Sequence, residues 1–166
     1  MILDSGNRTE FNTGAVRDIQ EGKGRCDLLP LDVVGGVVYN PYYGNEEKLL
    51  FITLDEFVRS GNPEVLVTAL HTFCEMNHWD RYSMALAVAK HMEEGSKKYG
   101  ERNWEKGIPV SRYIDSATRH LLKHLRGDKD EPHETAFCWN LMCCIWTCIH
   151  KPELNEYREA EDAEKV

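Results

Sequence analysis

"SRYIDSATRHLLKHLR", residues 111–126, is the stretch of the chain that decides the fold class. Its apolar side chains recur at helical spacing and form one stripe: Ile114, Ala117, Leu121 and Leu125. Ser111 follows Pro109 and stands where a helix cap is expected. We therefore predict an amphipathic helix over 111–126, whose stripe must be covered by other helices.

Three further segments carry helical signals. "DRYSMALAVAKHMEEGSKK", about 80–98, has Glu–Lys pairs at i,i+4 and an expected buried stripe of Ala85, Val88, Ala89, Met92 and Ser96. The segment 131–150 has Pro132 in its first turn and ends before Pro152. The segment 62–77 begins with Asn before Pro, a good helix start. The fold class predicted is mainly α, a helical bundle.

The remaining segments look less regular. Residues 1–50 are rich in turn signals and are expected to pack on the bundle as a loop-rich segment; 51–150 is the helical domain and 151–166 an acidic tail, frayed or solvated. "VVGGVVY" (33–39) and "LLFITL" (49–54) resemble short strands. "ITLDEFVRSG" (52–61) suggests a turn into a short helix capped by Thr53 or Asp55.

Composition limits the classes of partner. The 166 residues carry a net charge of -8, which disfavours nonspecific binding to a nucleic acid backbone. No apolar run approaches the ~18 residues that span a membrane, and the first residues do not resemble a signal peptide. A metal cation can still bridge an acidic protein to a polyanion such as a nucleotide. We expect a cytoplasmic protein that binds neither nucleic acid nor membrane.

Four of the six cysteines lie in "CWNLMCCIWTC", residues 138–148. Free cysteines are among the most buried residue types, so these are predicted to be reduced thiols packed as small hydrophobes. No CxxC pair is present, and a structural zinc site of the common kind is therefore not expected.

Polar residues on the helix 111–126 have two interpretations each. Asp115 and Arg119 share one flank, as a simple ion pair or as a metal ligand and a phosphate clamp. His120 and His124 share the other flank, as semi-buried histidines or as a metal chelate. The two flanks cannot face one small site from this helix alone.

The last helix places polar residues on an apolar face. His133, Phe137, Asn140 and Cys144 share that face, so His133 and Asn140 either bond neighbouring helices or line a pocket. The preceding "GDKDEPHE" (127–134) supplies four carboxylates: Asp128, Asp130, Glu131 and Glu134. These suit the helix dipole, or together with His133 a site for Mg²⁺ or Mn²⁺.

Two loops are candidate nucleotide contacts. In "YGERNWEKG" (99–107), Tyr99 and Trp104 either stack on a base or cover the end of the bundle, while Asn103 reads a base edge or braces the turn. The cations Lys98, Arg102 and Lys106 are placed to meet phosphates. In "EGKGRCDLLP" (21–30), Lys23 and Arg25 lie in a Gly-flanked turn, which is not the GxxxxGK[ST] of a P-loop.

Three blocks in order give a family resemblance: "GKGRCDLLP", then "EGSKKYGERNWEKGIPVSRYIDSATRHLLKHLRGDKDEPH", then "AFCWNLM". Over about residues 14–30 and 80–145 they resemble the phage dATP/dGTP diphosphohydrolase family, the MazZ-like proteins related to MazG-type all-α nucleoside triphosphate pyrophosphohydrolases. The resemblance implies metal-dependent cleavage (Mg²⁺, Mn²⁺ or Co²⁺) of a purine deoxynucleoside triphosphate to the monophosphate and pyrophosphate. It also implies phage nucleotide metabolism in the host cytoplasm and a homo-oligomer, dimer or tetramer.

The resemblance suggests residue roles. The ExxE and ExxD pairs of MazG-type enzymes are not found on the expected helices, so the expected metal ligands are Glu94, Asp115, Glu131 and His133, with Asp115, Glu131 and His133 catalytic. The expected substrate contacts are Lys23, Arg25, Lys98, Tyr99, Arg102, Asn103, Trp104, Arg119, His120 and Asn140. Two rivals stay open: a protein that binds nucleotide without cutting it, and a structural protein whose motifs serve helix packing.

Overall fold

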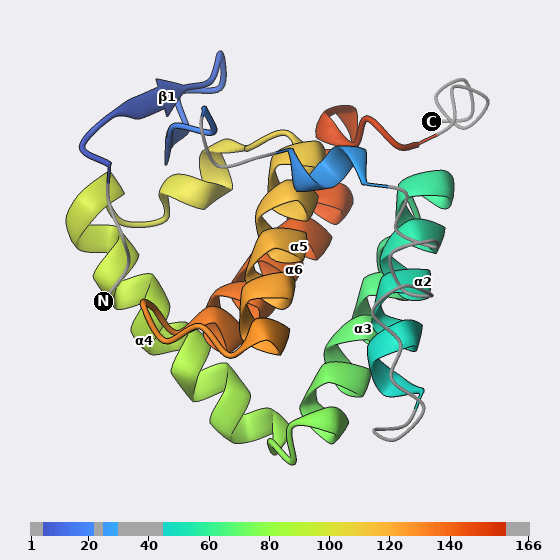
Figure 1. Ribbon diagram of the computed structural model, residues 1–166. Coiled ribbons are helices and arrows are strands. Elements are labelled where there is room, and N and C mark those ends of the chain that lie inside the picture. The colour runs from blue at the N-terminus through green and yellow to red at the C-terminus, as the bar shows by residue number, and fades with distance from the viewer. Residues whose placement is uncertain (1–4, 22–24, 30–44, 159–166) are drawn as a thin grey trace.

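The computed structural model describes residues 5–21, 25–29 and 45–158, and over these ranges the chain is a bundle of five α-helices (Figure 1). They are α2 (Glu46–Ser60), α3 (Pro63–Met76), α4 (Arg81–Tyr99), α5 (Val110–Arg126) and α6 (His133–His150). A small antiparallel hairpin, β1 (Arg8–Glu10) with β2 (Val16–Asp18), precedes them, and single 3-10 turns lie at Cys26–Leu28, Asn103–Lys106 and Pro152–Leu154. The predicted mainly-α bundle is confirmed. No helix within the described ranges is long and apolar enough to cross a membrane.

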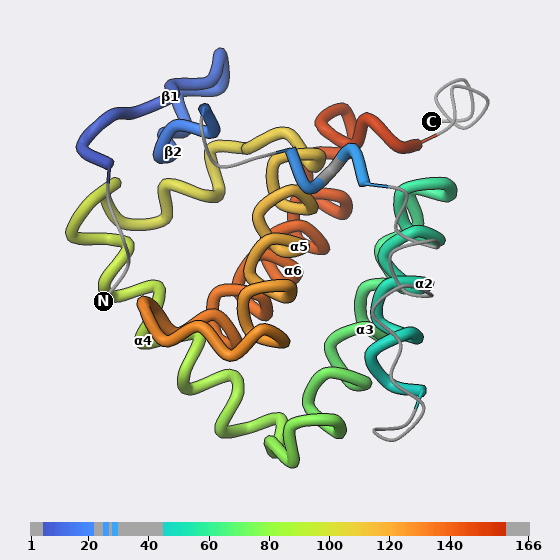
Figure 2. Tube along the Cα trace, viewed as in Figure 1, coloured from blue at the N-terminus to red at the C-terminus, as the bar shows by residue number. Residues whose placement is uncertain are grey.

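The centre of the bundle is the pair α5 and α6, which lie side by side in Figures 1 and 2. The predicted stripe of α5 is buried at Ile114, Ala117 and Leu121. Gly127 adopts the left-handed conformation at φ 88° and ends α5, which allows the chain to turn back toward α6. The chain reversal places the first turn of α6 beside the last turns of α5.

The front of the helical region differs from the sequence prediction. Residues 49–54 belong to α2 rather than to a strand, and Thr53 is in mid-helix, where its hydroxyl donates to the carbonyl of Leu49 at 2.7 Å. The apolar run continues at helical spacing through Phe57, which is why the helix is the better solution. The predicted strand at 33–39 lies outside the described residues. The helix start at Asn62 is confirmed, because its side chain accepts from the Glu64 amide.

The buried face of α4 is also shifted. Met84 and Val88 are its buried residues, whereas Ala85 and Ala89 of the expected stripe are exposed. Alanine offers too little apolar area to fix which face of a helix turns inward. Asp80 caps this helix by accepting from the amides of Tyr82 and Ser83.

Residues 152–158, expected to be frayed or solvated, instead pack on the bundle. Asn155 is buried and donates to the carbonyl of Gly61 at 2.8 Å. The Glu156 carboxylate accepts from the amide of Ser111 at 3.0 Å and from its hydroxyl at 2.7 Å. The first turn of α5 is therefore capped by Glu156, and the prediction that Ser111 itself is the cap is wrong.

The thiol prediction is confirmed. Cys138, Cys143, Cys144 and Cys148 are free and buried in α6. Burial raises the pKa of the Cys138 and Cys143 thiols, so they stay protonated and behave as packing groups.

Candidate functional site

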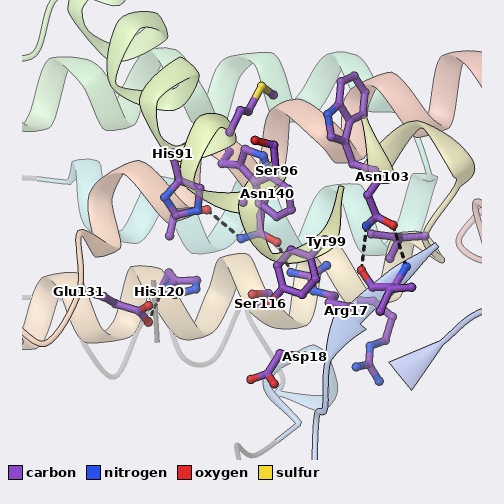
Figure 3. Close-up of a pocket in the computed structure, with 18 of the residues that line it drawn as sticks. Arg17, Asp18, His91, Ser96, Tyr99, Asn103, Ser116, His120, Glu131 and Asn140 are labelled. Carbon is purple, nitrogen blue, oxygen red and sulfur yellow. Dashed lines mark hydrogen bonds and ion pairs between the residues drawn. The ribbon is translucent and has the colours of Figure 1, made fainter. Parts of the chain in front are cut away.

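A pocket of about 890 Å³ opens where β2, the second half of α4, the loop after it, α5 and the start of α6 converge. Figure 3 shows Glu131 and His120 on one side of this pocket, Arg17 and Asn103 on the other, and Asn140 between them in the view. Both flanks of α5 reach the pocket, since Asp115, Arg119 and His120 all line it. The sequence indicated that the two flanks of this helix cannot face one small site from the helix alone. They reach the same pocket here because the pocket is large and other elements complete its walls.

One side of the pocket holds a cluster with the chemistry of a metal site, formed by His120, Glu131 and His133. The Nδ1 atoms of His120 and His133 are 3.0 Å apart, and each lies 3.6 Å from Glu131 Oε1. Metal–ligand distances of ~2.1 Å place neighbouring ligand atoms about 3.0–3.5 Å apart, so the three atoms suit one cation. The predicted pairing of His120 with His124 does not form, because the His124 side chain contacts Asn77 instead. His120 lies with Glu131 and His133.

The protonation of this cluster also suits a metal. Burial lowers the pKa of His120 well below its ordinary value, and the positive charges on His133, Arg119 and Arg17 lower it further. The Nε2 atom of His133 lies 2.7 Å from the Asp130 carboxylate. Hydrogen bonds with Lys123 and His133 lower the pKa of Asp130, so the carboxylate is ionised and accepts from Nε2. When Nε2 donates to Asp130, the Nδ1 atom of His133 faces the cluster, an orientation found in many metal-bound histidines.

Asp115 and Glu94 are not part of this cluster. Asp115 Oδ1 accepts from the Cys26 amide at 2.6 Å, while Oδ2 accepts from Gln20 Nε2 at 2.8 Å and pairs with Arg119. The carboxylate thus ties the N-terminal segment to α5. Of the four metal ligands expected from the sequence, Glu131 and His133 lie in this cluster, and Glu94 and Asp115 do not.

Four arginines line the pocket: Arg17, Arg102, Arg112 and Arg119. Arg102 and Arg119 were expected from the sequence, whereas Arg17 and Arg112 were missed. Arg112 donates to Gln20 and lies over the Phe11 ring. Arg17 lies in the short strand β2, whose sequence "VRD" is typical of an exposed strand. The sequence pattern therefore does not indicate that Arg17 lines a pocket.

The loop after α4 contributes unevenly. Tyr99, Arg102, Asn103 and Trp104 all line the pocket, and Lys98 is not among its lining residues. Asn103 braces the structure: its side chain accepts from the Val16 amide at 3.1 Å and donates to the Val16 carbonyl at 2.8 Å (Figure 3). Trp104 packs edge-on against Trp146, with ring centroids 5.0 Å apart.

The remaining expected contacts divide into three groups. Asn140 lines the pocket, donates to the Ala136 carbonyl and accepts from Arg17. Arg25 is exposed beside the turn Cys26–Leu28 and is not among the lining residues, and Lys23 lies outside the described residues. His91 of α4 also lines the pocket and was not predicted from the sequence. Its Nδ1 atom is buried and has no hydrogen bond in the described part of the chain.

Fold and site together define a helical bundle with a pocket that is lined by arginines and contains His120 and Glu131 of the cluster with metal-ligand spacing. Residues 76–157 match the family model described as "dATP/dGTP diphosphohydrolase, N-terminal". The match confirms the family resemblance over this segment, 82 of the 166 residues. The segment contains α4, α5 and α6 and the whole cation cluster. No curated protein and no solved structure matches the chain.

Proposed function

We propose that this protein hydrolyses dATP or dGTP to the monophosphate and pyrophosphate with the help of a divalent metal. The observation that carries the proposal is that one pocket, lined mostly by the segment matched by the family, joins the cluster His120–Glu131–His133 to four guanidinium groups. A polyphosphate needs both cations and hydrogen-bond donors around it, and the reacting water needs activation.

His120, Glu131 and His133 would hold the metal. When bound, the metal would neutralise the triphosphate and lower the pKa of a water. Two imidazoles and one carboxylate favour Mn²⁺ or Co²⁺ over Mg²⁺, which prefers oxygen ligands. Asp130 orients His133 through the 2.7 Å contact with its Nε2.

The other walls would bind the substrate. Arg119 is held in place by its ion pair with Asp115 and presents its planar fork to phosphate oxygens. Asp115 is then a positioning residue rather than a metal ligand. Tyr99, Trp104 and Trp139 supply ring faces and edges for a base on the opposite wall.

The alternative is a protein that binds the nucleotide without hydrolysing it. Its support is the donor set, because a single carboxylate in the cluster leaves less negative charge than the paired acidic motifs of MazG-type enzymes. A purely structural protein is the third possibility. It predicts that nucleotides leave the melting temperature unchanged.

The deciding experiment incubates the protein with each dNTP and NTP in Mg²⁺, Mn²⁺ or Co²⁺ and separates the products by chromatography. We expect a purine deoxynucleoside monophosphate and pyrophosphate in equal amounts, fastest with Mn²⁺ or Co²⁺. The variant His120→Asn should lose this activity, while His71→Asn, at an exposed histidine of α3, should keep it. Unchanged nucleotides with every metal would contradict the proposal, and a raised melting temperature in the same samples would favour the binding protein.

We also propose that the chain self-associates. Tyr82 and Leu86 on α4 are 85% and 73% exposed, and large apolar side chains on one helix face suit an interface between copies. Light scattering coupled to size-exclusion chromatography measures the mass directly, and a monomer at all concentrations would exclude an oligomer.

A further inference from the structure

We propose that Arg17 forms an anion subsite in the pocket wall and takes a phosphate group of the nucleotide. The inference rests on the proposed function and deepens it, because it assigns a phosphate ligand to a residue outside the segment 76–157 matched by the family. Arg17 belongs to β2, in the N-terminal hairpin.

The first observation is the charge on Arg17. Within the described part of the chain, no carboxylate lies within ion-pair distance of its guanidinium, and its Nη1 has no hydrogen-bond partner. Burial is the main cause that lowers the pKa of Arg17, and the positive charges of Arg112 and Arg119 lower it further. An uncompensated cation away from water is costly, and native proteins rarely retain one without an anionic partner.

The second observation is the orientation of the guanidinium. It lies over the rings of Tyr113 and Trp139, 5.3 Å and 5.7 Å from their centroids. Its Nη2 atom donates a hydrogen bond to Asn140 Oδ1 (Figure 3). These neutral contacts hold the fork in place without cancelling its charge. A guanidinium has five N–H donors, so most of its hydrogen-bonding capacity stays available for the several oxygens of a phosphate.

The third observation is that the strand carrying Arg17 is clamped on both sides. Before Arg17, the Asn103 side chain bonds both backbone groups of Val16. After it, Gln20 donates to Asp115, a carboxylate that lines the same pocket. The fold thus uses two buried polar side chains of the family-matched segment to keep Arg17 at the pocket.

The position of Arg17 relative to the cation cluster agrees with one extended ligand. Arg17 lines the same pocket as His120 and Glu131 of the cation cluster. A phosphate chain carries several negative charges, and both ends of this pocket attract them. A metal held by His120, Glu131 and His133 would neutralise one part of the chain, and Arg17 another.

The test measures binding without turnover. Isothermal titration calorimetry with inorganic pyrophosphate and with deoxyguanosine compares the wild type with Arg17→Gln, Arg17→Lys and the control Arg59→Gln, an exposed α2 arginine paired with Asp55. We expect Arg17→Gln to weaken pyrophosphate binding about tenfold or more, because a charge-assisted bond is lost. Arg17→Lys keeps the charge and should lose less. Deoxyguanosine binding and the control should be unchanged.

Two results would overturn the inference: pyrophosphate affinity unaltered by Arg17→Gln, or equal losses for pyrophosphate and deoxyguanosine, which would make Arg17 a residue that shapes the pocket. Circular dichroism and melting temperature confirm that each variant is folded, and Arg17→Lys provides the test should Arg17→Gln unfold. Hydrolysis unaffected by Arg17→Gln together with unaltered pyrophosphate affinity would remove this inference and leave the proposed function. If instead pyrophosphate binding depends on Arg17 but the protein hydrolyses no dNTP, the anion subsite is supported and the proposed hydrolysis is contradicted.

Discussion

The two halves of α6 are both buried, but they are built from different side chains. His133 and Asn140 lie in the first half, each with polar partners: Asp130 and His120 for the histidine, Arg17 for the amide, which lines the pocket. The second half, from Leu141 onward, buries Cys143, Cys144 and Cys148 in the apolar core. The comparison shows that the histidine and the amide of this helix lie where polar partners satisfy them, whereas the second half packs mainly thiols and apolar side chains into the core.

The largest expected effect is on the apolar half. Leu141→Ala removes a fully buried side chain and should lower the free energy of unfolding by about 2–5 kcal/mol through lost transfer energy and a cavity. Urea denaturation measures this. Ile149→Ala, at an exposed isoleucine of the same helix, is the matched control and should change stability by less than about 0.5 kcal/mol. Equal effects of the two substitutions would contradict the assignment of Leu141 to the core.

The polar half should respond in the opposite way. Glu131→Gln removes the carboxylate of the cation cluster and should reduce dNTP hydrolysis by about a hundredfold or more, since an enzyme rarely keeps activity without a metal ligand. Stability should change little. Glu134→Gln, on the next turn and with a side chain 41% exposed, should keep most activity. Titration with Co²⁺, followed by its visible absorption, tests metal binding independently, and intact Co²⁺ binding by Glu131→Gln would exclude Glu131 as a ligand.

The link between α5 and the C-terminal segment gives a smaller effect. Glu156→Ala removes both hydrogen bonds to Ser111 at the start of α5 and should cost about 1 kcal/mol, the usual value of a helix cap. Glu153→Ala, in the exposed turn Pro152–Leu154, is the control. Thermal denaturation compares the two. A loss no greater than that of the control would show that the Glu156 cap does not form in solution.

The smallest effect concerns pH. Burial lowers the pKa of His91 below its ordinary 6.5, so in acid the unfolded chain takes up a proton that the folded chain does not. Its contribution to stability is complete above pH 6.5 and is lost as the pH falls below that value. In the presence of a chelator, His91→Leu should reduce the fall in unfolding free energy between pH 7.5 and 5.5, whereas His71→Leu should not. Identical pH slopes for wild type and His91→Leu would contradict a buried neutral His91.

The sequence by itself determined the helical architecture and much of the site. The apolar period of 111–126 and the segments on either side required helices that cover one another, and α4, α5 and α6 follow. Asn62, Pro63 and Pro132 marked helix starts correctly because capping and proline effects are local. Glu131 and His133 were predicted together as candidate metal ligands because they lie two positions apart in the chain, and the structure places them in one cluster.

Only the tertiary structure decided which polar groups meet. His120 joins Glu131 and His133 because the left-handed Gly127 turns the chain back on itself, and Asp115 is drawn away by Gln20 and the Cys26 amide. The role of Arg17 depends on Asn103, 86 positions later in the chain, which clamps the preceding residue. Helix periodicity is a property of neighbouring residues, whereas partners distant in the chain are chosen by packing, and no pattern within a short window records that choice.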